Sequence, residues 1–452
     1  MKRIAIILLA VLLPLASQAL AGYSGPVTVT LPGNAVAKTL CAAGGGCDYT
    51  DPAVWVSERI AGQDLVAGNR SEVLQVKAGV YDFTINVPNA TATTDTDHRI
   101  IVMAYPGDEC TGPTVGARII WTAPDAGEAI QLYNSWCYAY NLGVSRPSGN
   151  NAGSCGGAWM GGGSLGDPTT GGGLYGIYAW DIVNPSGNAT AIEIETDGGT
   201  ISQCYATDVS ASGSATGLSL HTSPNSSISD SEAYSITGAS AYGISVNVTS
   251  TNAILDSVAA HSISSLDAGA AAIGAALRIG QSNNVIAKNI LGYSASAVNG
   301  NGVGAVVVTP STGTSLFNCT FAKCQIGLLA YAVTAIATNV VSEQNTTANW
   351  SAISGSWTKT TCTDGGGVQF VDAAGGDFHL VVGDTVAKDQ GTTLAGVATD
   401  GDGNPRPYGP AYDIGWDEYY VAPTGLPVDN GIPWGGRIWN TIKKPFNGGW
   451  KR

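Results

Sequence analysis

The 452-residue chain carries 34 acidic and 20 basic residues, so its formal net charge at pH 7 is −14, and only 12% of its residues are charged. This balance disfavours nucleic acid as a partner, because phosphate binding requires clustered Lys and Arg. The 61 glycines and the sparse charge also argue against a mostly helical protein, whose outer faces need Glu, Lys and Arg.

Residues 1–21 have the pattern of a secretory signal peptide. Lys2 and Arg3 precede an apolar run, and Ala19-Leu20-Ala21 offers a small-x-small cleavage site. The run is too short to span a membrane, and no second long apolar run follows. We therefore expect a secreted or cell-surface protein with no membrane span. Its mature chain would carry 18 basic and 34 acidic residues, a net charge of −16.

Residues 22–70 are expected to form an N-terminal strand and cap. Thr28–Leu31 has the composition of a strand, and Asp51-Pro52 is a helix-start signal, since a capping residue precedes proline at the first turn. A short amphipathic helix is predicted over residues 53–61. Such a helix would cover the unpaired edges at the end of a solenoid.

Two short apolar patterns recur within residues 71–342, most clearly after Ala189. The first pattern supplies pairs expected to face inward: Ile192/Ile194, Leu218/Leu220, Ile244/Val246, Leu277/Ile279, Val306/Val308 and Leu328/Ala330. The second begins 8 to 10 residues later, at Ile201, Ile228, Ile254, Ile286, Leu316 and Ile336. Three places further on, a mostly small polar residue recurs: Cys204, Ser231, Ser257, Asn289, Cys319 and Asn339.

This repetition predicts an all-β, right-handed parallel β-helix with a short N-terminal capping helix. Repeats of about 20–35 residues that carry short strands are typical of solenoids, and alternation with period two indicates strands. A small polar residue at one corner suits a ladder of stacked side chains. The alternative is an all-β sandwich in which the alternations coincide by chance.

Residues 148–173 are glycine-rich and are interpreted as a loop that leaves the solenoid. The aromatic residues Tyr175, Tyr178 and Trp180 follow it, and their faces are candidates for stacking on sugar rings in a glycan subsite. Packing of the loop onto the solenoid is the structural alternative.

Nine cysteines are an odd number, so at least one has no partner within the chain. Cys41 and Cys47 flank a glycine-rich turn and are a plausible local disulfide. Cys137 and Cys155 are candidates for a second one that ties down the glycine-rich loop. The two cysteines at the ladder positions are expected to be buried thiols.

Residues 343–420 change character and are predicted to form a separate closing segment, with a linker and a basic, Trp-rich tail over 421–452. The run from Phe370 to Leu380, Asp400-Gly401-Asp402-Gly403-Asn404-Pro405-Arg406 and the stretch from Tyr412 to Tyr419 resemble the closing part of bacterial right-handed parallel β-helix repeat proteins with a choice-of-anchor Q domain. The opening coil, Asp48-Tyr49-Thr50 and the run from Val76 to Tyr81, is similar to the same proteins. The resemblance implies a pectate-lyase-like fold and a secreted or cell-surface location. The sorting signal usual in that family is replaced here by the basic tail.

The outward positions of the first pattern hold the candidate catalytic residues. Glu193 and Glu195 lie on one predicted strand, and His221 lies one coil later, about 4.8 Å away if the coils stack in register. Two carboxylates at this separation can act as acid and nucleophile or base in glycoside hydrolysis. Alternatively, His221 or Arg278 can serve as the base in β-elimination from a uronic acid, which also needs charge neutralisation, often by Ca²⁺. Ordinary solvated polar residues are the structural alternative.

Two further sets are candidate Ca²⁺ ligands. Asp230 and Asp256 are predicted to share a register one coil apart, with Lys288 in the next coil as the alternative partner. Asp400, Asp402 and Asn404 alternate as in a Ca²⁺ loop, but Pro405 occupies the position where an EF-hand requires glycine. The alternatives are a solvated turn ladder and a tight turn stabilised by Asp and Asn side chains. No other cofactor is predicted.

Three functions remain open from the sequence, in this order. The first is non-catalytic binding to polysaccharide or a cell-surface glycan, or surface adhesion. The second is a lyase or hydrolase that acts on an acidic polysaccharide, and the third is a self-associating structural surface protein. The order reflects the sparse charge on the coils; clustering of Glu193, Glu195 and His221 in a groove would favour an enzyme.

Overall fold

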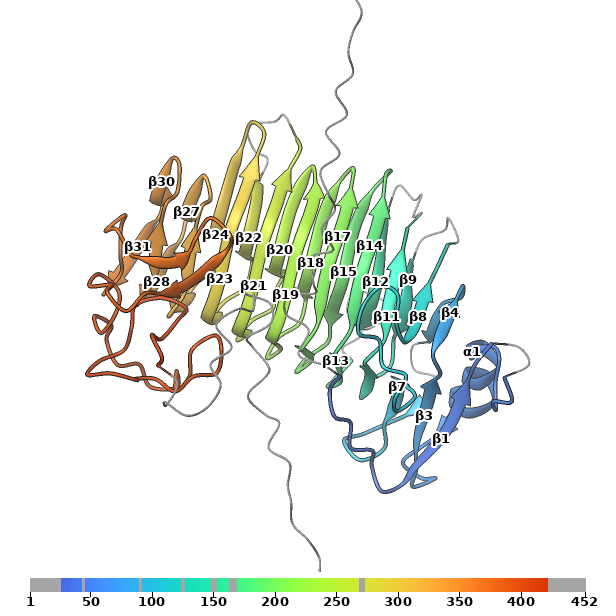
Figure 1. Cartoon of the computed structure of the whole chain (residues 1–452). Helices are drawn as coiled ribbons and strands as arrows, with labels where there is room; N and C mark the ends of the chain where they lie inside the picture. The colour runs from blue at the N-terminus through green and yellow to red at the C-terminus, as the bar shows by residue number, and fades with distance from the viewer. Residues whose placement is uncertain are drawn as a thin grey trace, which may run out of the picture.

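The computed structural model describes residues 26–42, 45–88, 92–122, 127–147, 153–161, 169–267 and 273–421. The expected signal peptide and the basic tail lie outside these residues. The described chain winds into a right-handed parallel β-helix, as predicted, with its one short helix beside the first coils and its C-terminal segment at the other end (Figure 1). None of the described helices has the length and apolar character needed to cross a membrane.

One wall of the solenoid is a ten-stranded parallel sheet to which each coil contributes one strand. In spatial order the strands are β5 (Ile85–Val87), β9 (Gly127–Leu132), β12 (Ser154–Gly161), β15 (Asn188–Glu195), β18 (Ser214–His221), β20 (Ser240–Asn247), β22 (Ile273–Gly280), β24 (Asn301–Val308), β27 (Ile326–Tyr331) and β30 (Ala348–Ile353). Side chains alternate between the core and the outer face along each strand, so the outer face forms columns of stacked side chains.

The remaining wall is a bent nineteen-stranded parallel sheet. Its strands are β1 (Ala35–Leu40), β3 (Ser71–Val76), β4 (Gly79–Tyr81), β7 (Ile100–Ala104), β8 (Ala117–Ile120), β10 (Cys137–Tyr140), β11 (Gly143–Arg146), β13 (Gly173–Tyr175), β14 (Tyr178–Asn184), β16 (Thr200–Ser202), β17 (Tyr205–Ala211), β19 (Ser227–Gly238), β21 (Ile254–Ser265), β23 (Ile286–Ala297), β25 (Ser315–Phe317), β26 (Thr320–Ala322), β28 (Thr334–Thr338), β29 (Val341–Glu343) and β31 (Ser356–Thr360). β2 (Gln63–Asp64) pairs separately with β6 (Ala92–Thr93).

The nineteen-stranded sheet bends at a recurring left-handed residue. The residues at this corner have φ between 48° and 56°, and they are Gln203, Asp230, Ser257, Asn289, Asn318 and Asn339. Asn and Asp tolerate this conformation better than most residues. The predicted ladder therefore mixed two columns, because Cys204, Ser231 and Cys319 lie one residue later and face the core, in register with Val258 and Ile290.

The second pattern was predicted to begin one residue too early in three coils, and one predicted inward pair was wrong by one residue. Leu255 and Ala287 face the core in register with Ile228, whereas Ile254 and Ile286 point outward and are 45% and 38% exposed. The same error occurs at Ile336, which is 40% exposed. In β24, Ala305 and Val307 face inward, and the predicted pair Val306/Val308 lies on the outer face. A one-residue slip in a strand exchanges its two faces.

The N-terminal cap is built as predicted around a short helix, α1 (Pro52–Trp55), continued by the π-helical turn Val56–Ile60. Asp51 caps it by accepting a hydrogen bond of 2.8 Å from the backbone N–H of Ala53. Trp55 is fully buried against the first coils. The predicted strand at Thr28–Leu31 is absent; β1 forms instead and pairs with β3.

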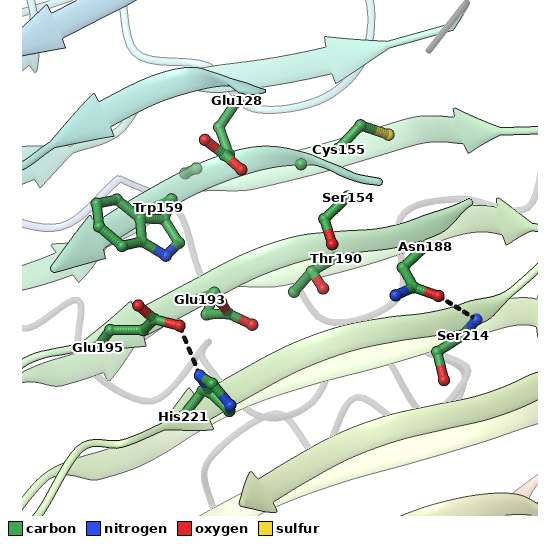
Figure 2. Close-up of a pocket in the computed structure, with 12 residues that line it drawn as sticks. Glu128, Ser154, Cys155, Trp159, Asn188, Thr190, Glu193, Glu195, Ser214 and His221 are labelled. Carbon is green, nitrogen blue, oxygen red and sulfur yellow. Dashed lines mark hydrogen bonds and ion pairs between the residues drawn. The ribbon is translucent and has the colours of Figure 1, made fainter. Parts of the chain in front are cut away.

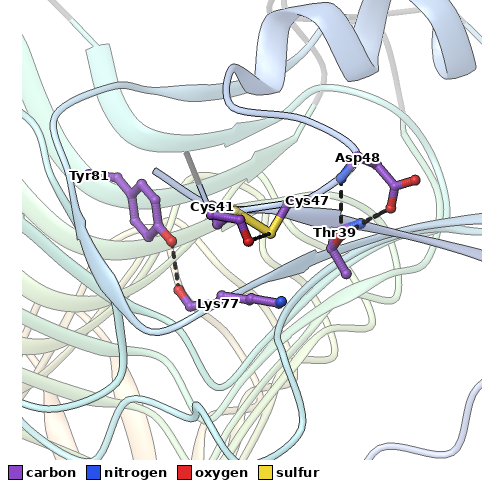
Figure 3. Close-up of a disulfide and its surroundings, with 7 residues drawn as sticks. Thr39, Cys41, Cys47, Asp48, Lys77 and Tyr81 are labelled. Carbon is purple, nitrogen blue, oxygen red and sulfur yellow. Dashed lines mark hydrogen bonds between the residues drawn. A yellow bond between two sulfur atoms is a disulfide. The ribbon is translucent and has the colours of Figure 1, made fainter. Parts of the chain in front are cut away.

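The predicted disulfide between Cys41 and Cys47 is present beside the first coil (Figure 3). Next to it, Asp48 accepts hydrogen bonds from the backbone N–H and the hydroxyl of Thr39, and the Tyr81 hydroxyl donates to the carbonyl of Lys77. The predicted bridge between Cys137 and Cys155 is absent, because Cys137 lies in the nineteen-stranded sheet and Cys155 in the ten-stranded one.

We expect the folded protein to react slowly with a thiol reagent such as dithionitrobenzoate. Six of the seven free cysteines are buried, and burial raises the pKa of Cys137, Cys204, Cys319 and Cys324 to about 12, which suppresses the reactive thiolate. Only Cys362 is partly exposed. Titration should therefore find at most one accessible thiol in the native protein and seven after denaturation; several fast-reacting native thiols would contradict this packing.

The glycine-rich segment is not simply a loop, since its residues Ser154–Gly161 form β12 within the ten-stranded sheet. The small residues Gly156 and Gly157 explain why β12 lacks an obvious alternating pattern.

At the C-terminal end of the solenoid, β30 and β31 extend both sheets past residue 342, where the regular coils were predicted to end.

The closing segment packs on the outer face of the nineteen-stranded sheet near its C-terminal end. Its hairpin pairs β32 (Phe370–Asp372) with β33 (Asp377–Leu380) in antiparallel orientation. Phe378 and Trp416 are almost fully buried against Leu291 of β23. Inside the segment, Arg406 and Glu418 form a buried ion pair at 3.0 Å.

Candidate functional site

A pocket of about 260 Å³ opens on the outer face of the ten-stranded sheet, across β9, β12, β15 and β18. Figure 2 shows its polar side chains directed into one hollow. The lining consists of Glu128, Ser154, Cys155, Gly156, Ala158, Trp159, Asn188, Thr190, Glu193, Glu195, Ser214 and His221. The predicted catalytic residues Glu193, Glu195 and His221 thus come together in one pocket.

Two glycines on β12 contribute to the hollow. Gly156 lies between Glu128 of β9 and Thr190 of β15, and a Cβ there would approach Glu128 Cγ to 2.9 Å. Gly161 lies beside Glu195, and a Cβ there would be 2.6 Å from the Cβ of Glu195. Larger side chains at these positions would have to displace the carboxylates, so glycine keeps the centre of the pocket open.

The two carboxylates and the imidazole lie within reach of one another. Glu195 Oε1 and His221 Nδ1 are 2.5 Å apart, linking the ends of neighbouring strands β15 and β18 (Figure 2). Glu193 is two residues before Glu195, so both side chains leave the same face of β15. One ligating atom from each of Glu193, Glu195 and His221 lies within 4.8 Å of the others.

Glu193 and Glu195 lie in different electrostatic surroundings. Burial, followed by the charge of Glu195, raises the pKa of Glu193 to about 7. The hydrogen bond to Glu195 raises the pKa of His221. At neutral pH the pocket therefore combines a carboxyl group able to donate a proton, Glu193, with a second carboxyl group that the imidazole of His221 orients. Paired carboxyl groups in such different environments are typical of acid/nucleophile pairs.

Nine of the twelve lining residues were not predicted from the sequence, and two of these nine bear on the chemistry of the pocket. Trp159 projects from β12 next to the carboxylates, and its ring lies 4.7 Å from that of Tyr133, centroid to centroid. Glu128 accepts a hydrogen bond of 2.9 Å from Gln131 Nε2. Trp159 was overlooked because it lies inside the glycine-rich segment interpreted as a loop. The useful signal was the alternation over residues 158–160, in which the buried Ala158 and Met160 flank Trp159.

Arg278 does not line the pocket. It lies on β22, two strands beyond β18, and its guanidinium is 5.2 Å from the centroid of the Tyr242 ring. Its cation–π contact and its place two strands beyond β18 keep it out of contact with the pocket, although its charge acts on His221. The elimination scheme with Arg278 as base therefore has no geometric support in the pocket.

The predicted glycan-binding aromatics lie on the other sheet. Tyr175 stacks on Tyr140 at 5.0 Å, and Tyr178 is 3% exposed and packs against Trp180 at 5.7 Å. Val29 of the N-terminal segment packs in the cluster that contains Tyr175. These rings pack on one another and against the N-terminal segment, and Tyr178 offers little surface to a ligand. Glycan binding by Tyr175, Tyr178 and Trp180 stays a prediction.

The first predicted Ca²⁺ pair is offset by one residue, since Asp256 is in register with Ser229 rather than Asp230. Asp256 forms an ion pair with Lys288 at 2.9 Å and accepts a hydrogen bond from Asn289. The lysine that was the other possible partner thus neutralises Asp256. Burial raises the pKa of Asp230, and the nearby charge of Asp256 adds to the shift.

In the second predicted Ca²⁺ set, Asp400 acts as the centre of a tight turn. Its buried carboxylate accepts hydrogen bonds from the backbone N–H groups of Asp402, Asn404 and Glu418 and from the Asn404 side chain. Asp402 instead reaches His379 Nε2 at 2.6 Å. Ligand binding by Asp400, Asp402 and Asn404 stays a prediction, but the backbone donors already occupy Asp400.

Comparisons with known proteins add little beyond the architecture. No protein-family model matches the chain, and no curated protein matches it in sequence. Among solved structures, the crystal structure of pectate lyase Pel9A is similar at 14% sequence identity and a TM-score of 0.43, covering 81% of this chain and 90% of that one. At this level of similarity the comparison does not extend to site residues or activity.

Proposed function

We propose that this β-helix protein is a polysaccharide-cleaving enzyme, a glycoside hydrolase whose site is the pocket on β9, β12, β15 and β18. The observation that carries the proposal is the joint position of Glu193, with a pKa near 7, and Glu195, held by His221, in one open pocket. The sequence alone favoured non-catalytic binding, and clustering of these residues was the condition for preferring an enzyme.

In the proposed reaction Glu193 is the general acid and Glu195 the nucleophile. Glu193 donates its proton to the leaving oxygen of the glycosidic bond while the Glu195 carboxylate bonds to the anomeric carbon. Water then breaks the glycosyl ester, and the Glu193 carboxylate takes the proton of that water. His221 positions Glu195 and balances the charge of its carboxylate before the ester forms and again after water has broken it. Carboxyl groups about 5 Å apart suit this two-step route, which retains the anomeric configuration.

Trp159 and Tyr133 are proposed to bind the sugar ring next to the scissile bond. Aromatic faces provide apolar contact for the C–H face of a sugar, and the polar lining residues can hydrogen-bond its hydroxyl groups. A pocket of 260 Å³ lies slightly below the usual range for drug-sized ligands, about 300–1,000 Å³, and suits a short portion of a chain. The open outer face of the solenoid leaves the rest of the polymer free to extend along the sheet.

The proton on Glu193 is expected to determine how the rate of cleavage depends on pH in the alkaline range. An acid catalyst must be protonated, and the pKa of this carboxyl is raised to about 7, so kcat/KM should fall as the pH rises through about 7. Deprotonation of His221 at higher pH acts in the same direction. The measurement is the initial rate of sugar release between about pH 5 and about pH 9. A rate that stays constant or rises over the alkaline half of this range would contradict the role of Glu193.

The test of the proposed function is incubation of residues 22–452 with a panel of neutral, amino-sugar and uronate polysaccharides. Released reducing ends and retention of the protein on each polymer are measured together. Release from at least one polymer is expected. Retention without release would support the binding module that the sequence favoured, and neither signal would favour self-association.

The resemblance of the closing segment to a choice-of-anchor Q domain and the signal-peptide pattern of residues 1–21 support a further part of the proposal. The enzyme would act outside the cell or at its surface, where polysaccharide is found. Fractionation of the producing cells, with detection of the mature chain in medium or envelope, tests this location.

A further inference from the structure

The charged groups around the pocket are almost all of one sign. Glu128, Glu193 and Glu195 line it, whereas His221 is the one basic side chain among its described lining residues and is already paired with Glu195. Neither Lys nor Arg belongs to the described lining.

The basic side chains around the pocket do not offer a free cation to a ligand. Arg146 acts on the charge of Glu128, but it is fully buried, donates to the carbonyl of Gly127 and lies 4.3 Å from the ring centroid of Trp121. Arg278 stacks on Tyr242 two strands away from His221.

From this charge distribution we infer that the pocket selects against uronic acids, so that the sugar bound beside Glu193 and Glu195 carries no carboxylate. The inference rests on the proposed function and names its substrate class: a polysaccharide of neutral or amino sugars. It differs from the acidic polysaccharide expected from the sequence. A sugar carboxylate in this pocket would lie beside Glu128 and Glu195, and the one basic lining group, His221, is already paired with Glu195. Like-charge juxtaposition in a partly buried site is strongly unfavourable.

Glu128 is the residue through which this selection can be altered. It lies across Gly156 from the catalytic pair and has no part in the proposed proton transfer or bond formation. Its side chain is half-buried, and burial raises its pKa, as expected for a carboxyl group whose charge has little water around it. Replacing it by Gln removes one negative charge and keeps the side-chain shape.

The experiment compares two polymers with the same linkage, polygalacturonate and the same polymer with its carboxyl groups reduced to alcohols. Retention and release by the wild-type protein are measured at low salt, above the pKa of the polymer carboxyl groups. We expect the wild type to favour the reduced polymer by at least about 10-fold, and the ratio to shift toward polygalacturonate in Glu128→Gln. Asp208→Asn, which removes one exposed charge from the other sheet, should leave the ratio unchanged.

The outcomes separate this inference from the proposed function. Equal or better handling of polygalacturonate by the wild type would overturn the inference and leave the enzyme assignment intact. An unchanged ratio in Glu128→Gln would also overturn it, because the pocket charge would then have no part in selection. If these polymers and all polymers of the wider panel are neither retained nor cleaved, the proposed function itself fails.

Discussion

Glu195→Gln is expected to reduce the rate of sugar release by about 10²- to 10⁴-fold, the range typical for removal of a group that acts directly on the reacting bond. The amide preserves the shape of the side chain and a hydrogen-bonding atom for His221, but it is a poor nucleophile. The folded structure and the retention of the protein on its polymer should therefore change little. The measurement is the initial rate of reducing-end release, with circular dichroism as the check on folding.

The chain contains a matched control for this substitution. Glu232 and His261 form a second Glu–His pair, at 3.0 Å, on adjacent strands β19 and β21 of the other sheet. The imidazole of His261 stacks between Tyr234 and Tyr293 and lies outside the pocket. Glu232→Gln should leave the rate of release close to that of the wild type. Equal losses in Glu195→Gln and Glu232→Gln would show that loss of stability, not of a nucleophile, explains the effect.

Arg406→Ala is expected to lower the free energy of unfolding of the closing segment by about 3–5 kcal/mol, the usual effect of breaking a buried ion pair from one side. Arg406 is 6% exposed, and its guanidinium binds Glu418 and the carbonyl oxygens of Gly415 and Trp416. Without it, the buried Glu418 carboxylate keeps only backbone N–H partners, those of Tyr408 and Asp413. Hydrogen exchange of residues 370–420 measures the change locally.

An exposed ion pair in the same part of the chain provides the comparison. Lys359 and Asp364 are 3.3 Å apart, and their side chains are 39% and 59% exposed. Lys359→Ala should therefore cost no more than about 1 kcal/mol. Arg406→Ala with exchange rates no faster than those of Lys359→Ala would contradict a stabilising role for the buried pair.

The fold was predictable because every coil of the solenoid needs apolar residues at the same core-facing positions. Pairs such as Ile192/Ile194 and Leu218/Leu220 must face one core, which fixes both the period and the parallel register. Glu195 and His221 could be placed side by side for the same reason. The prediction of which β24 side chains face the core was wrong. The nearly continuous apolar run from Val303 to Val308 has no alternation that would distinguish the two faces of this strand.

The rest of the pocket was not predictable, because it depends on a strand with an unusual composition. β12 uses glycine where other strands have larger side chains, and the sequence pattern of Gly156 and Gly157 indicates a loop. Trp159 and the space around Glu128 depend on that strand. The hydrogen bonds that Asp400 accepts from backbone groups also carry no periodic signal, so a turn was difficult to distinguish from a Ca²⁺ loop.

The anomeric configuration of the first product tests the central claim most directly, because the spacing of Glu193 and Glu195 determines it. Proton NMR of the reaction with a cleaved polymer, recorded before mutarotation, identifies the anomer that is formed. Ligating atoms within 4.8 Å predict a product that retains the configuration of the substrate. An inverted product, or an unsaturated sugar formed by elimination, would contradict the assignment of Glu193 as acid and Glu195 as nucleophile.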